Sequence, residues 1–209
     1  MRKHFEELLS QLKTILCDMC GVCAYAVRKS ADAFRAQDKE LAAGVKQSEI
    51  ASDAKEAEAE RLCMKIVITQ QPVAHDLFMV TAAMKMVTDL ERIADQAADI
   101  AAITLRTQGC VLPPSLAEMA DTAAEMVEQC AAALKEFDDA SARNVCRRDD
   151  VLDGLFEAAK AEISAAAERG GCGECSVDML LAAKYFERIG DHAVNVAEWI
   201  CFAVGENAL

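Results

Sequence analysis

One segment of this 209-residue chain occurs twice, and the two copies are separated by nearly half of the sequence. Residues 89–101 read DLERIADQAADIA, and residues 185–197 read YFERIGDHAVNVA, at an offset of 96 residues. Upstream of each copy, two acidic residues four positions apart also recur, at an offset of 100 residues: Glu49 with Asp53, and Asp149 with Asp153. Repeats in the same order at similar offsets indicate a duplicated structural unit.

Each unit is predicted to be helical. Only three Pro and nine Gly interrupt the chain, and its frequent Ala, Leu, Met, Glu and Lys favour helix over sheet. The expected helices span residues 3–36, 38–69, 73–107, 115–139, 141–169 and 176–203. We therefore expect an all-α fold of six helices, arranged as two tandem three-helix bundles, residues 1–109 and 110–209.

Apolar residues spaced by three and four mark the buried side of these helices. In the duplicated segments the expected core positions are Leu90 and Ile93 in the first copy and Phe186 and Ile189 in the second. On a helical wheel the acidic residues of each segment fall on the opposite side. We therefore expect the acidic stripes to be exposed.

Composition restricts the classes of partner. The formal net charge of −13 would be repelled by nucleic-acid phosphates and anionic lipid, and we expect no nucleic-acid binding. Acidic residues at positions 6–7 stand where a signal peptide is apolar, and no uncharged apolar run could span a membrane. We expect a cytoplasmic protein without membrane insertion, and its ten cysteines are expected to be reduced thiols.

The acidic stripes are the strongest candidate for a binding site. Residues four apart on a helix lie about 40° apart around the axis, so each stripe follows one line. Like charges at this spacing repel by a few tenths of a kcal/mol per pair. Carboxylates without imidazole or thiolate suit hard cations or carboxylate-bridged iron. The alternative interpretation is an ordinary solvated surface.

The same residues resemble the PhoU family of phosphate transport regulators. Residues 186–198, FERIGDHAVNVAE, are similar to the second signature of that family almost throughout. QPVAHDL at 71–77, followed by LERIAD at 90–95, resembles the first signature. The resemblance covers nearly the whole chain and implies two three-helix bundles.

The resemblance also implies a function. PhoU-like proteins damp phosphate-starvation signalling by contacting a phosphate ABC transporter and a membrane sensor histidine kinase. We therefore expect a non-enzymatic negative regulator, an adaptor between these two partners, that forms a homodimer and acts at the inner face of the membrane. The resemblance assigns no residue of this chain to partner binding.

Acidic motifs of the family can hold multinuclear metal clusters. The implied cofactors are divalent or ferric cations, namely Fe, Zn, Mg, Mn or Ca. The implied metal ligands are eight carboxylates: Glu49, Asp53, Glu91, Asp95, Asp149, Asp153, Glu187 and Asp191.

Several positions depart from the family pattern. Ala94 stands where Gly is usual, Asp99 and Asp53 stand where Asn is usual or common, and Phe78 stands where Arg is usual. The two Asp residues make the first stripe more acidic, which favours a cation. Phe78 puts in doubt the contact that an arginine would make.

Cysteine and histidine allow further interpretations. Cys17, Cys20 and Cys23 have an iron–sulfur spacing, but they follow the apolar repeat of the first helix and are expected in the core. Cys172 and Cys175, with Cys110 nearby, would offer a zinc site only with further ligands. His192 is expected at the surface.

Two other functions were considered. A ferritin-like di-iron oxidoreductase requires Glu-x-x-His on two helices with inward-facing ligands, and none of the three histidines has Glu three residues before it. A PhoU-like accessory protein of another phosphate transporter would share the fold and differ only in its partner.

Overall fold

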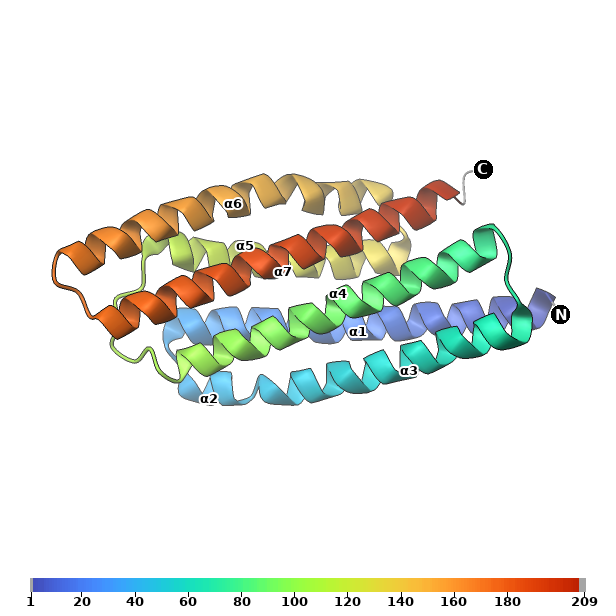
Figure 1. Ribbon diagram of the computed structural model, residues 1–209, viewed down its shortest axis with the longest axis horizontal. Helices are drawn as coiled ribbons and strands as arrows, with labels where there is room; N and C mark the ends of the chain where they lie inside the picture. Colours follow the sequence, from blue (N-terminus) through green and yellow to red (C-terminus); the bar gives the residue numbers. More distant parts are fainter. Residues whose placement is uncertain (1, 207–209) are drawn as a thin grey trace.

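The computed structural model describes residues 2–206, with side chains over residues 3–204, and this part of the chain contains helices and turns without strands (Figure 1). The seven helices of the described residues are α1 (Arg2–Ala36), α2 (Lys39–Ala43), α3 (Lys46–Gln70), α4 (His75–Thr104), α5 (Pro114–Glu136), α6 (Asp139–Glu168) and α7 (Gly173–Glu206). The predicted all-α class is confirmed. None of these helices has an apolar stretch long enough to cross a bilayer.

The helix expected over residues 38–69 is interrupted. α2 ends before Gly44, and α3 begins after Val45. Both residues keep right-handed helical dihedral angles, so α2 and α3 together occupy the place of one helix. In the second half, α6 passes through Asn144 and Val145 without a break.

The duplication is visible in the backbone of two turns. Gln37, after α1, and Phe137, after α5, both adopt positive φ, 51° and 52°. Asp38 and Asp138 follow them, and each caps the next helix by accepting backbone N–H bonds on its carboxylate. Asp38 and Asp138 thus close equivalent turns 100 residues apart.

The two halves share one core. α4 packs along α7 and α1 packs along α5, in addition to the contacts within each half (Figure 1). Leu90, Ile93, Phe186 and Ile189 are all 0% exposed, which confirms the predicted core positions. Phe34 of α1 meets Phe186 of α7 edge to face, with ring centroids 5.8 Å apart. Each bundle therefore buries apolar surface against the other.

The cysteines of α1 behave largely as expected. Cys20 and Cys23 are fully buried, and Cys17 is partly buried at the edge of the core. Cys23 Sγ donates to the carbonyl oxygen of Leu90 at 3.2 Å. These thiols pack as small apolar groups.

The segment joining the halves is fixed to both of them. α4 ends at Thr104, earlier than the expected residue 107. On the first half, the Gln37 amide donates to the carbonyl of Cys110 at 2.6 Å and accepts from the Gly109 N–H at 3.1 Å. On the second half, Cys110 forms a disulfide with Cys175 near the start of α7. The expectation that all ten cysteines are reduced thiols is wrong for this pair, because the fold brings the joining segment onto the first turn of α7.

Candidate functional site

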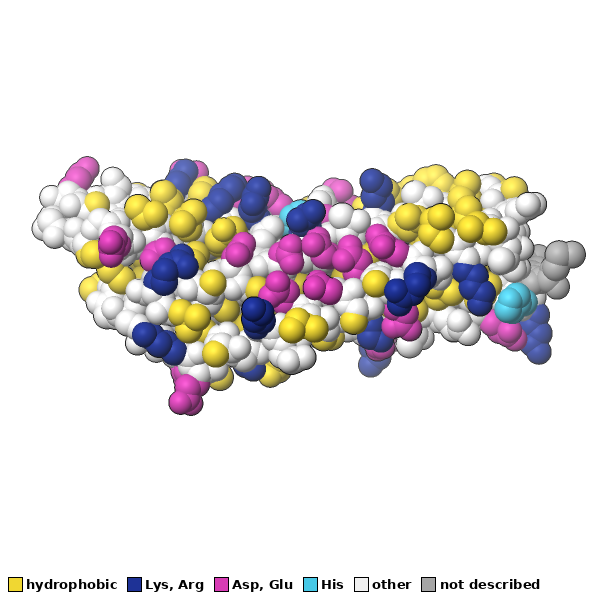
Figure 2. All heavy atoms as spheres, turned by 60° about the horizontal axis from the view of Figure 1, so that its bottom comes forward, with side chains coloured by type: hydrophobic (Ala, Val, Ile, Leu, Met, Phe, Trp, Pro, Cys, Tyr) yellow, Lys and Arg dark blue, Asp and Glu magenta, His cyan; other side chains and the backbone are white. Residues whose placement is uncertain are grey.

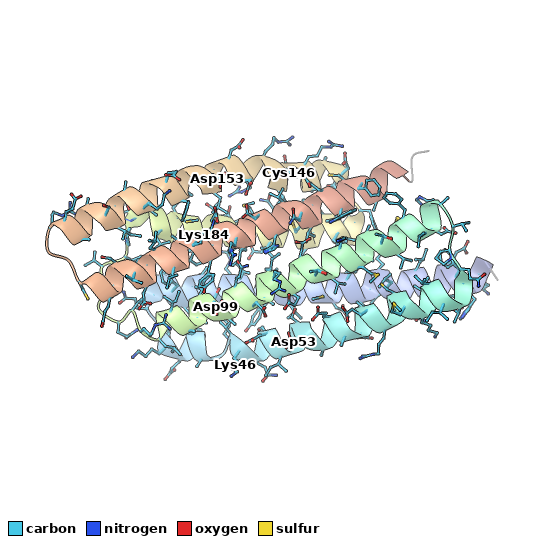
Figure 3. The ribbon with its side chains drawn as sticks, viewed as in Figure 1. Lys46, Asp53, Asp99, Cys146, Asp153 and Lys184 are labelled. Carbon is cyan, nitrogen blue, oxygen red and sulfur yellow. A yellow bond between two sulfur atoms is a disulfide. The ribbon has the colours of Figure 1, made fainter. Side chains whose placement is uncertain are left out.

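Carboxylates from α3 and α4 gather at the seam between these helices. We call Glu49, Asp53, Glu56, Glu91 and Asp95 the first acidic cluster. Figure 2 shows acidic side chains massed in the middle of one face, with Lys and Arg on either side. Figure 3 labels Asp53 on α3 and Asp99 on α4. A cavity of about 610 Å³ adjoins the cluster, and Glu49, Asp95 and Asp99 contribute to its lining.

Glu91 is the most perturbed group of the first acidic cluster. Its side chain is 19% exposed and pairs with Arg92 at 3.2 Å. Burial, together with the charge and hydrogen bond of Asp95, raises the pKa of Glu91 to about 7. Burial and the charges of Glu60 and Asp53 also raise the pKa of Glu56. Burial and mutual repulsion therefore both oppose ionisation of these carboxyl groups in the first acidic cluster.

The equivalent carboxylates of α6 and α7, Asp149, Asp153, Glu187 and Asp191, form the second acidic cluster. Burial and the charges of Asp153 and Asp191 raise the pKa of Asp149 to about 6. Burial and the charge of Glu187 raise the pKa of Asp191. Oδ1 of Asp149 is sealed from solvent and has no hydrogen-bond partner among the described residues. An unpaired buried carboxylate oxygen is costly and suits a cation.

Close packing of α6 on α7 seals this oxygen. A Cβ built on Gly190 would lie 2.2 Å from Leu152 Cδ2 and 3.3 Å from Asp149 Oδ1. In the first half the equivalent residues are Ala94 and the buried Ser52. The larger residue at 94 is thus matched by a smaller one at 52, which accounts for Ala94 standing where the family pattern has Gly.

The structure places all eight predicted ligands on the two seams, four per half. Asp53, Asp153 and Asp191 are exposed as expected, but the expectation is wrong for Glu91 and Glu187. The stripes were expected to be exposed, but the side chains of Glu91 and Glu187 are only 19% and 15% exposed. The helical wheel placed them opposite the core, whereas α3 and α6 cover them from the side. Among the described side chains, no three His, Cys, Asp or Glu are arranged to hold a metal ion. The donor chemistry suits a hard cation, but binding would require the carboxylates to move together.

Two polar contacts between α4 and α7 were missed by the sequence analysis. Asp89 accepts from the Asn195 amide at 3.0 Å and bonds the ring of His192 at 2.9 Å. Tyr185 shares a hydrogen bond with Asp99, and burial followed by the charge of Asp99 raises the pKa of Tyr185. His192 is therefore a half-buried contact between the halves, rather than the surface residue that we expected.

These contacts follow the duplication. Asp89 is equivalent to Tyr185, and Asp99 is equivalent to Asn195, each at an offset of 96 residues. In each half, the first residue of the duplicated segment therefore contacts the eleventh residue of the segment in the other half. Both pairs lie in the duplicated segments, and an approximate twofold relation between α4 and α7 would have predicted them.

Phe78, in place of the family's usual Arg, is part of an aromatic group. Its ring lies 4.3 Å from that of Phe202 between centroids, and Phe202 meets Trp199 edge to face at 5.8 Å. The Phe78 ring therefore contributes to the packing of α4 against α7.

The duplicated bundles and their paired acidic seams define a class of helical proteins built from two copies of one acidic three-helix unit. The family model described as PhoU domain matches residues 16–104 and again residues 116–200. The chain belongs to the PhoU family.

Individual relatives agree with this assignment. The phosphate-specific transport system accessory protein PhoU homolog of Zymomonas mobilis is 36% identical over 205 residues, covering 96% of this chain and 86% of that protein. The homolog of the same description from Clostridium acetobutylicum is 30% identical over 202 residues, covering 94% and 92%. The crystal structure of PhoU from Pseudomonas aeruginosa superposes with a TM-score of 0.89 at 26% identity, covering 96% and 99%.

Proposed function

We propose that this protein is a non-enzymatic accessory protein that represses phosphate uptake and phosphate-starvation signalling. The observation that carries the proposal is the match of both halves to the PhoU domain, together with relatives described as phosphate transport accessory proteins. The protein would work in the cytoplasm, at the inner face of the membrane, as an adaptor between a phosphate ABC transporter and a sensor histidine kinase.

We propose that both acidic clusters bind divalent or ferric cations. The pKa values of Glu91 and Asp149, raised first by burial and then by neighbouring carboxylates, support this role, because a bound cation offsets both the cost of burying a negative charge and the repulsion between the carboxylates. The first acidic cluster would supply Glu49, Asp53, Glu91 and Asp95, and the second would supply its four carboxylates. The cation would neutralise local charge and so favour the approach of an acidic partner surface.

A homodimer is part of the same proposal. Apolar side chains on the outer side of α3 support it, since Met64 and Ile68 are 52% and 68% exposed. Sedimentation of wild type and a Met64→Glu/Ile68→Glu variant tests this part. Loss of the dimer in the variant is expected, and a monomeric wild type would contradict it.

Deletion and complementation test the regulatory function. A strain lacking the gene should express a phosphate-starvation reporter constitutively in phosphate-rich medium, and the wild-type chain should restore repression. Crosslinking from the complemented strain should recover the transporter ATPase and the sensor kinase. Unchanged reporter activity in the deletion strain would reject the regulatory function, and recovery of a different phosphate transporter would reassign the partner.

A further inference from the structure

A groove between α5 and α6 is lined by a set of polar groups that neither acidic cluster uses. Its volume is about 430 Å³, and its lining residues are Gln129, Ala132, Ser141, Asn144, Arg147 and Arg148. The lining contains two arginines and no carboxylate, in a protein with a formal net charge of −13. Arg148 and Asp149 are adjacent in sequence, but Arg148 bonds Glu125 on α5 whereas Asp149 lies against Gly190 on α7. The groove is therefore a site separate from the second acidic cluster.

The two arginines retain unused capacity to donate hydrogen bonds. Arg148 pairs through Nη2 with Glu125, but its Nε is sealed from solvent without an acceptor among the described residues. Arg147 is exposed and donates to a neutral acceptor, Oδ1 of Asn144. Glu125 can balance one of the two positive charges, so the groove keeps an excess. Planar guanidinium groups with free N–H donors are well suited to tetrahedral oxyanions.

Gln129 adds a second unpaired atom of the opposite kind. Its Oε1 is buried and has no hydrogen-bond donor within the described part of the chain. Both atoms are closed to solvent in this conformation, so a ligand in the groove would reach them only after the two side chains turn toward it. A ligand that then satisfied both Arg148 Nε and Gln129 Oε1 must accept and also donate hydrogen bonds. Inorganic phosphate at neutral pH does both, because it keeps at least one P–O–H beside its anionic oxygens. Sulfate and the dianion of a phosphate monoester have no such donor.

The first half of the molecule lacks this set of groups. At an offset of 100 residues, Gln47 and Ser48 occupy the places of Arg147 and Arg148, and Lys29 occupies the place of Gln129. The corresponding groove between α1 and α3 includes Gln47, Ser48 and Lys29 in its lining. The two halves have thus diverged at this groove, and the arginine pair is confined to the second half.

We propose that the α5/α6 groove binds inorganic phosphate, with Arg147 and Arg148 donating to its anionic oxygens and Gln129 accepting from its P–O–H. The inference rests on the proposed function and deepens it, because it would let a regulator of phosphate uptake sense phosphate directly. The overall negative charge of the protein opposes approach of the anion, so salt should modulate the affinity.

Titration calorimetry of the full-length protein tests the proposal. The protein is first treated with chelator, so that phosphate does not bind through metal on the acidic clusters, and all titrations share one ionic strength set with chloride. Wild type should bind inorganic phosphate saturably, and at least about tenfold more tightly than sulfate or phenyl phosphate. The Arg147→Gln/Arg148→Ser variant, which carries the first-half residues, should lose at least about tenfold in affinity.

Matched variants separate binding from folding. Arg143→Gln alters an arginine of the same helix that pairs with Asp139 at 2.9 Å and does not line the groove, and it should bind like wild type. Arg147→Gln alone keeps the Arg148–Glu125 pair and should still weaken binding, with unchanged helicity by circular dichroism. Gln129→Met should abolish the preference for phosphate over sulfate.

Several outcomes would overturn the proposal. The first is that wild type does not bind phosphate saturably. The second is that the double variant binds phosphate as tightly as wild type, and the third is that wild type binds sulfate as tightly as phosphate. Tighter binding of phenyl phosphate would identify a phosphate monoester, not the free anion, as the occupant. If such results accompany normal repression of the reporter by the Arg147→Gln/Arg148→Ser chain, only the groove assignment fails and the regulatory function stands.

Discussion

The two acidic clusters occupy equivalent seams but balance their charge differently. In the first cluster Glu56 lies close enough to Asp95 and Arg92 of α4 to interact with their charges, and Glu60 follows it on α3. In the second half these positions are Phe156 and Lys160. The Lys160 ammonium lies 4.8 Å from the centre of the Phe156 ring, and the Lys184 ammonium lies 5.5 Å from it. Lys184, which is labelled on α7 in Figure 3, also pairs with Glu187 of the second cluster.

The comparison shows that duplication kept the carboxylates while their surroundings changed. The first cluster is strongly acidic, with Arg92 as the cation paired to Glu91. The second cluster has lysines close by, and it holds Asp149 Oδ1 unpaired behind a glycine contact. We therefore expect protein stability to depend more on cation binding at the first cluster and more on side-chain packing at the second.

Metal binding should give the largest difference between the clusters. A cation that binds only the folded protein stabilises it by about 2.7 kcal/mol at one hundred times its dissociation constant. Glu91→Gln/Asp95→Asn should remove more of this gain than the equivalent Glu187→Gln/Asp191→Asn, because Glu56 adds charge where Phe156 does not. Thermal unfolding with added Mg, Mn, Fe, Zn or Ca measures it. Equal melting temperatures with and without every metal would leave both clusters as solvated surface.

Packing at Gly190 should give the next largest effect. Gly190→Ala places a Cβ against Leu152 and should destabilise the protein by about 2 kcal/mol, as overpacking of a filled core does. In the first half Ala94→Gly creates no clash and should cost about 1 kcal/mol through helix propensity. Urea unfolding compares the two variants. Leu152→Ala should rescue Gly190→Ala, and failure of this rescue would show that the glycine is needed for another reason.

Acidity should produce the smallest difference. A carboxyl whose pKa is raised by folding stabilises the fold while it is protonated. For Glu91 that contribution is complete below about pH 4.5 and is lost as the pH rises through about 7. Glu91→Gln should therefore match wild type in acid and exceed its stability above pH 7, by about 1 kcal/mol after allowance for solvent screening.

Asp149→Asn provides the matched measurement in the second half. The stability of Asp149→Asn should rise above that of wild type as the pH passes through about 6, about one pH unit below the corresponding rise for Glu91→Gln. Denaturant midpoints measured across pH 4.5–8.5 without metal would resolve the two curves. Parallel curves for wild type and both variants would show that the two carboxyls titrate alike in the folded and unfolded protein.

Much of the fold could be predicted because periodicity and duplication are properties of the sequence itself. The core positions Leu90 and Phe186 followed from spacing alone, and the breaks near Pro72 and Pro113 followed from proline, whereas the ends of α4 and α5 lie three residues earlier than expected. The break between α2 and α3 could not be predicted, since Gly44 and Val45 remain in helical conformation.

The chemistry of the site was only partly accessible. The eight carboxylates could be placed on two faces, but the partial burial of Glu91 and Glu187 could not be predicted, because a single-helix wheel does not show a neighbouring helix beside the face. Contacts across the halves, such as Asp89 with His192, depend on how α4 crosses α7. The disulfide depends on where residue 110 meets α7. The unpaired atoms of Arg148 and Gln129 likewise emerge only when α5 and α6 are packed together.

The disulfide turns part of the chain into a covalent ring. Cys110 and Cys175 are 65 residues apart in sequence, and α5, α6 and the turn between them lie inside the loop that they close. A protease that cuts one peptide bond anywhere in that loop would leave the two fragments attached. They would migrate as one band on a gel until a thiol reductant was added. A nicked molecule would thus keep both fragments in a single covalent particle.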